Sequence, residues 1–147
     1  MLRISTKGRY GMRLMLELAL NYTQGPTLLK DIAKNQDISV GYLDHIIAPL
    51  KVAGLIISSR GAHGGYTLAK HPKNINAREI IEILEGKVSL VECTQPSSPC
   101  SRVSKCTTRY LWCEVNKSLL NTLESFVLED LVNKSIEKKD NDLMYNI

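Results

Sequence analysis

The hydrophobic period of this chain changes from helical to strand-like after Gly54, and that change limits the folds available to it. Apolar residues recur at helical spacing over residues 6–22, over a short segment that Thr27 can cap, and over residues 39–54. Residues 55–60 and 66–69 are then strand-like and flank a glycine-rich stretch at 61–65. We therefore expect three helices followed by a β-hairpin.

The third helical segment carries the clearest local signals. Ser39 is a good N-cap, and Ile38 before it can pack against Leu43 as a hydrophobic staple. One apolar face follows, at spacings of three and four residues, made of Leu43, Ile46, Ile47 and Leu50. Pro49 is expected to kink or loosen the end of this helix, and Gly54 to terminate it.

Two more helices are expected in the rest of the chain. Asn76 and Glu79 form a capping-box pattern that opens a helix ending at Gly86, before a short extended run at 88–91. Residues 107–131 have a longer helical pattern with a continuous apolar stripe. So long a helix at the edge of a small domain needs cover for its stripe, which a second copy of the chain can provide. The polar tail at 133–147 is expected to be disordered.

Three helices followed by a glycine-rich hairpin is the order of a winged helix-turn-helix, a DNA-binding fold. The polar side of the third helix carries Ser39, Tyr42, Asp44 and His45, whose side chains could reach base edges in a major groove. Arg60, beside the hairpin tip, could contact a phosphate or a minor groove. The plainer alternative is that these are solvated surface residues of a structural module.

The charge of the chain is distributed unevenly, in a way that agrees with DNA binding. The net charge is +4, and residues 1–92 hold 12 Lys/Arg against 8 Asp/Glu, whereas residues 93–147 hold 7 against 7. There is no 18-residue apolar run and no apolar signal segment, so we expect a cytoplasmic chain with reduced thiols. No phosphate loop, nucleophile elbow or H-E-x-x-H motif is present, so we do not expect an enzyme.

All four cysteines lie within 21 residues, at Cys93, Cys100, Cys106 and Cys113. The stretch around the first three is polar and contains two prolines, which is typical of a loop whose thiols can converge on a soft metal. No closely spaced pair of the zinc-knuckle type occurs, and the wider spacing suits a larger group such as an iron–sulfur cluster. A zinc-stabilised module, thiol redox chemistry and inert thiols stay open as alternatives.

Several segments together resemble the IscR-type transcription regulators, the winged-helix family that also includes NsrR, RirA and CymR. The resemblance covers residues 1–133. It rests on LRISTKGRY at 2–10, ISVGYL at 38–43, GLI at 54–56, RG at 60–61 and GGY at 64–66 in the hairpin, and three cysteines before Leu111 and Trp112.

This resemblance implies a homodimeric repressor that binds palindromic DNA and controls iron–sulfur assembly genes. It implies a cluster on Cys93, Cys100 and Cys106, with 2Fe–2S favoured over 4Fe–4S, and DNA contacts at the five positions named above. Regulators of the same fold can instead sense nitric oxide, iron or thiol state.

Two departures from the family pattern leave the fourth cluster ligand open. Arg109 stands where IscR-like members carry a histidine, and Arg9 stands where NsrR-like members carry an aspartate. Cys113 is a candidate, because it shares a helix face with position 109; the alternative is a buried thiol packed beside Trp112. We therefore divide the chain into a DNA-binding domain (1–92), a cluster-binding loop (93–106), a dimerisation helix (107–132) and a tail (133–147).

Overall fold

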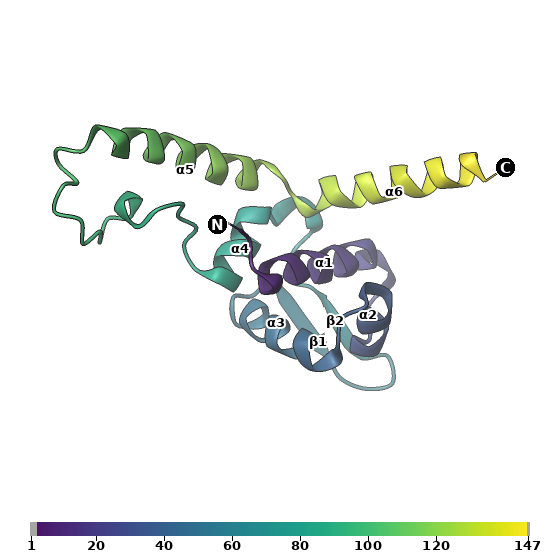
Figure 1. The fold of residues 1–147 in the computed structure, drawn as a ribbon. Coiled ribbons are helices and arrows are strands. Elements are labelled where there is room, and N and C mark those ends of the chain that lie inside the picture. The colour runs from purple at the N-terminus through teal and green to yellow at the C-terminus, as the bar shows by residue number, and fades with distance from the viewer. Residues whose placement is uncertain (1–2, 147) are drawn as a thin grey trace.

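The computed structural model describes residues 3–146. In chain order its elements are α1 (Thr6–Leu20), α2 (Leu29–Gln36), α3 (Val40–Val52), β1 (Ile56–Ser59), β2 (Gly65–Leu68), α4 (Ala77–Glu85), α5 (Thr107–Ser125) and α6 (Leu128–Tyr145), with 3₁₀ turns at Tyr22–Gln24, Pro72–Asn74 and Glu92–Thr94. The expected fold class, mainly α with one small hairpin, is confirmed. Figure 1 shows α1 to α4 and the hairpin as one globular body, from which α5 and α6 project in opposite directions.

Local capping explains where the helices of this body begin and end. The Ser39 hydroxyl accepts a hydrogen bond from the Tyr42 amide at 3.2 Å, and the Asn76 side chain accepts one from the Glu79 amide at 2.9 Å. Both caps agree with the sequence prediction. The helix α3 continues through Pro49 to Val52, and Gly54, at φ 77°, completes the end of the helix.

The hairpin pairs β1 with β2 antiparallel, from Ile56 opposite Leu68 to Ser59 opposite Gly65. Thr27, which we expected to cap α2, instead exchanges two backbone hydrogen bonds of 2.8 Å with Tyr66. The cap position of α2 belongs to Leu28 and has no side-chain hydrogen bond. The reason is that the backbone of Thr27 satisfies the outer edge of β2, which fixes the hairpin against the α1–α2 connection.

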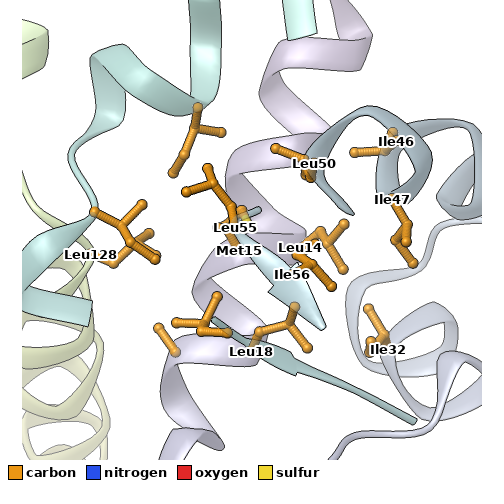
Figure 2. Packing of buried hydrophobic residues seen from close by; sticks show 14 of the residues in the cluster. Leu14, Met15, Leu18, Ile32, Ile46, Ile47, Leu50, Leu55, Ile56 and Leu128 are labelled. Carbon is orange, nitrogen blue, oxygen red and sulfur yellow. The ribbon is translucent and has the colours of Figure 1, made fainter. Parts of the chain in front are cut away.

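The core lies between α1, α3, α4 and the hairpin (Figure 2). The predicted face of α3 is fully buried, and it packs against Leu14, Met15 and Leu18 of α1. Leu128 at the start of α6 also belongs to this core, at 1% exposure. Each fully buried side chain of this kind contributes about 1.5–3 kcal/mol, so the globular body has its own source of stability.

The C-terminal third differs from the sequence prediction in two respects. The helix expected over 107–132 ends at Ser125, and most of the tail expected to be disordered lies in α6. The break occurs because the backbone of residues 126–128 pairs with the segment before α4: Ala77 N–H donates to the Phe126 carbonyl at 2.8 Å, and Leu128 N–H donates to the Ile75 carbonyl at 2.9 Å. Val127 N–H then donates to the Asp130 carboxylate at 2.9 Å, which caps α6.

None of the helices within residues 3–146 is long and apolar enough to cross a membrane.

Candidate nucleic-acid interface and cysteine loop

The exposed side of α3 carries the residues that sequence reasoning assigned to DNA. Ser39, Asp44 and His45 are exposed, and Tyr42 is half-buried. They lie on this side because the opposite face of α3 is buried in the core. The Ser39 hydroxyl caps the helix and still has a proton to donate.

The hairpin tip supplies the second part of this surface. Arg60 is exposed at the end of β1, and no ion pair involves it within residues 3–146. Gly61 has φ 103°, and a Cβ on Gly64 would lie 2.6 Å from the Ser59 carbonyl oxygen, so this tight turn needs glycine. Lys51 Nζ donates to Ser58 Oγ at 2.9 Å, which ties α3 to β1. The helix α3 and the hairpin are thus held together, and Arg60 adds an exposed cation beside the hairpin tip.

The four cysteines carry free thiols at separate places on the loop and on α5. Cys93 lies in the turn Glu92–Thr94 and is half-buried, Cys100 is exposed, and Cys106 is the N-cap residue of α5. Cys113 is half-buried on α5 and lines a pocket of 250 Å³ with Thr94. Within residues 3–146 no three His, Cys, Asp or Glu side chains are close enough together to hold a metal ion.

Arg109 connects the two ends of the cysteine loop. Its Nε donates to the Cys93 carbonyl at 2.8 Å. The Cys106 sulfur lies 3.1 Å from Thr108 Oγ1, and this hydroxyl, followed by the backbone N–H of Arg109, lowers the pKa of the Cys106 thiol. The Arg109 side chain therefore closes the loop, while the Thr108 hydroxyl and the Arg109 backbone N–H favour the thiolate form of Cys106. Sequence reasoning noted Arg109 only as a non-ligand, since a contact across 16 residues leaves no local pattern.

The thiols of Cys93, Cys100 and Cys106 do not lie around one point in this structure, but their chemistry fits an iron–sulfur cluster. Three thiols on one segment match the ligand type that such clusters require. The hydrogen bonds that hold residues 95–105 are local turns, such as Ser98 N–H to the Gln95 carbonyl at 3.2 Å and Lys105 N–H to the Arg102 carbonyl at 2.9 Å. Turns of this kind can rearrange at small energetic cost, so the loop can adapt to a group bound by its thiols.

Comparison with known proteins gives relatives that are described as transcriptional regulators. The family model Rrf2, described as an iron-dependent transcriptional regulator, matches residues 4–134. The chain is 40% identical over 144 residues to the HTH-type transcriptional regulator CymR of Bacillus subtilis (strain 168), which covers 98% of this chain and 99% of that relative.

Two solved structures with the same architecture extend the comparison. The structure of CymR (YrzC), the global cysteine regulator of B. subtilis, superposes with a TM-score of 0.78 at 42% identity, over 91% of this chain and 98% of that one. The structure of T. potens IscR gives a TM-score of 0.76 at 38% identity, over 91% and 88% of the two chains.

Proposed function

Because the chain belongs to the Rrf2 family of transcriptional regulators, we propose that it is a homodimeric repressor whose affinity for a palindromic promoter site is set by an iron–sulfur cluster. The expected resemblance to IscR-type regulators is confirmed by these relatives, and with it the expectation of a DNA-binding protein that is not an enzyme. The sensed signal is the part that we propose. By the resemblance to IscR, the controlled genes are those of iron–sulfur assembly.

One observation carries the cluster proposal: three thiols lie on a single loop between the DNA-binding domain and α5, and the DNA-binding domain itself has none. Cys93, Cys100 and Cys106 would hold the cluster, with 2Fe–2S favoured. When bound, a cluster with a weak fourth ligand would be labile, so oxidation, nitric oxide or iron shortage could remove it. Arg109 cannot ligate, so the candidates for the fourth ligand are Cys113, a histidine, a carboxylate such as Glu92, and an external thiol or water.

DNA reading is assigned to the exposed side of α3 and to the wing. We assign Ser39, Tyr42, Asp44 and His45, whose exposed or half-buried side chains share this side of α3, to base edges, and Arg60 to a phosphate or a minor groove. A dimer would present two such surfaces to half-sites that lie ~34–36 Å apart on one face of the DNA.

The contacts at the base of α5 support a route from the loop to the DNA. Arg78 of α4 donates to Glu124 of α5 at 2.9 Å, and Leu90 N–H donates to the Asn116 side chain at 3.1 Å. Since α5 is attached to both the loop and α4, a change in the loop can alter how α5 meets the DNA-binding domain. A coupling of about 1–3 kcal/mol is sufficient for regulation.

A second candidate function is direct sensing of thiol state without a cluster. It is favoured by the similarity to CymR, named a global cysteine regulator, and by the lowered pKa of the Cys106 thiol, for which the Thr108 hydroxyl is the main cause. In this alternative the loop cysteines react with oxidants or small disulfides.

The cluster is tested on protein purified and reconstituted without oxygen. We expect brown protein with thiolate-to-iron absorption, and Cys93→Ala, Cys100→Ala and Cys106→Ala should each remove most of the colour and iron. Ser101→Ala, in the same loop, is the matched control and should keep both. Colourless protein with stoichiometric zinc would contradict the cluster, and loop thiols that control DNA affinity without iron would favour the second candidate. An unchanged spectrum in Cys113→Ser would exclude Cys113 as a ligand.

DNA binding is tested by anisotropy on a palindrome selected from a randomised pool. Arg60→Ala should weaken binding and reduce the slope of log K against log salt by about 0.9, the value for one phosphate contact. Asp44→Asn should instead change the preference among base pairs by ~1–3 kcal/mol. Lys138→Ala, on α6, is the control. If both variants bind every sequence like the wild type, the assigned surface is wrong.

A further inference from the structure

A polar network holds the end of α2 against α1. Glu17 is 7% exposed, and its two carboxylate oxygens accept hydrogen bonds from Asn35 Nδ2 and Gln36 Nε2, each at 2.8 Å. One turn earlier on α1, Arg13 donates through Nε to Gln36 Oε1 at 3.2 Å and through Nη2 to the Gln36 backbone carbonyl. That carbonyl lies in the last turn of α2, where no helical N–H remains to bond it. A guanidinium is a favourable partner there, because it also meets the negative end of the helix dipole.

Arg13 also reaches α3 through a pair of aromatic rings. Its guanidinium carbon lies 5.2 Å from the centre of the Tyr10 ring. The Tyr10 and Tyr42 rings meet edge to face, with centroids 5.6 Å apart and planes at 79°. Tyr10, Arg13 and Glu17 are spaced at i, i+3 and i+7, so one face of α1 carries all three. This face contacts the chain on both sides of the turn from which α3 begins.

We propose that Tyr10 and Arg13 are positioning residues that set the orientation of Tyr42 for base reading. The inference rests on the DNA-binding role proposed above for α3. The edge-on contact with Tyr10 restricts the Tyr42 ring, and the half-buried position leaves part of this side chain accessible to DNA. Arg13 holds the Tyr10 ring and the end of α2 at the same time, so a single side chain fixes the ring and the start of the recognition helix.

The surroundings of Arg13 argue against a direct contact with phosphate. Its guanidinium is half-buried and is engaged by Gln36 and by the face of Tyr10. Arg60, by contrast, is exposed and has no ion-pair partner within residues 3–146. The positioning role therefore predicts a loss of sequence discrimination without a change in salt dependence, which separates Arg13 from Arg60.

The first measurement needs no DNA. In the full-length protein labelled with 3-fluorotyrosine, the ¹⁹F signal of Tyr42 is assigned by its absence in Tyr42→Phe. Tyr10→Leu and Arg13→Lys should shift or broaden this signal, because both alter the contact that orients the ring. Arg9→Lys, one turn from Arg13, is the matched control, since the Arg9 guanidinium bonds only to Thr6, at 3.2 Å, among its side-chain hydrogen bonds in residues 3–146.

The second measurement compares binding to the selected palindrome with binding to unrelated DNA of equal length. Arg13→Lys should reduce this ratio by about threefold to tenfold, the size of one lost aromatic contact, with an unchanged salt slope. Tyr10→Phe, which keeps the ring, should retain the wild-type ratio. If Arg13 acts through Tyr42, the fold-loss of this ratio in the double variant Arg13→Lys/Tyr42→Ala should be smaller than the product of the fold-losses in the two single variants.

The outcomes separate this inference from the proposed function. If the wild type discriminates and Arg13→Lys discriminates equally well, with the ¹⁹F signal of Tyr42 unmoved, the positioning role is overturned and the proposed function is not. A salt slope that falls in Arg13→Gln as it does in Arg60→Ala would make Arg13 a phosphate contact and overturn it as well. A wild-type protein that does not discriminate at all would overturn the proposed function, and this inference with it.

Discussion

At the scale of single residues, Glu17 is the charged side chain that the described part of the chain buries, and its hydrogen-bond partners are neutral amides. Glu17→Leu should lower the free energy of unfolding by about 1–3 kcal/mol, because it leaves amide donors at the α1–α2 contact without acceptors. Urea unfolding at fixed protein concentration measures the change. Glu137→Leu removes an exposed carboxylate paired with Lys134 and should change stability by less than about 1 kcal/mol. Equal effects of the two substitutions would show that the buried network adds no stability.

Arg109 gives a second prediction at this scale, because its guanidinium bonds the Cys93 carbonyl across the cysteine loop. Arg109→Gln in cluster-free protein should increase tryptic cleavage after Arg102 and Lys105 by about tenfold or more, because a lost hydrogen bond from a charged group costs ~1.5–3 kcal/mol. Lys117→Gln, which removes an exposed tryptic site from the same helix, is the control. Cleavage at wild-type rates would mean that Arg109 does not hold the loop closed.

At the scale of elements, features encoded by neighbouring residues could be predicted and those encoded across the chain could not. The caps at Ser39 and Asn76 depend on an amide three residues away, so the sequence predicts them directly. The break before α6 depends on backbone hydrogen bonds from Ala77 N–H to the Phe126 carbonyl and from Leu128 N–H to the Ile75 carbonyl, which no local pattern records. The same holds for the bond from Arg109 to Cys93 in the candidate site and for the burial of Glu17 at the α1–α2 contact, since both require partners from other elements.

The attachment of α6 to the core through Leu128 leads to a prediction at the element scale. Leu128→Ala should cost about 2–5 kcal/mol, the range for large-to-small substitutions in a packed core, since this side chain is 1% exposed. Leu143→Ala, at 66% exposure on the same helix, is the matched control and should cost less than about 1 kcal/mol. Thermal and urea unfolding provide the comparison, and equal costs would mean that α6 does not dock through Leu128.

At the scale of the whole molecule, one copy of the chain leaves the apolar side of α5 largely uncovered. This helix has no buried residue, and Tyr110, Leu111, Trp112 and Val115 are exposed by 40% or more. Leu111 and Val115 are spaced by four residues and lie on one side of the helix, away from the side where Cys113 and Leu120 line a pocket with Arg78 of α4. An exposed apolar stripe on a projecting helix is suited to pairing with the same stripe of a second copy.

The dimer can be tested by placing charge on this stripe. Leu111→Glu combined with Val115→Glu should convert a dimer into a monomer in sedimentation velocity, because two carboxylates per chain would face two others across the interface. The monomer should also lose most of its affinity for the palindrome, since each copy then binds one half-site without the gain from linkage. Asn121→Glu adds charge on α5 outside the stripe and should leave the dimer intact. A double variant that stays dimeric and binds the palindrome normally would place the dimer contact elsewhere, and α5 would then need a different partner for its exposed face.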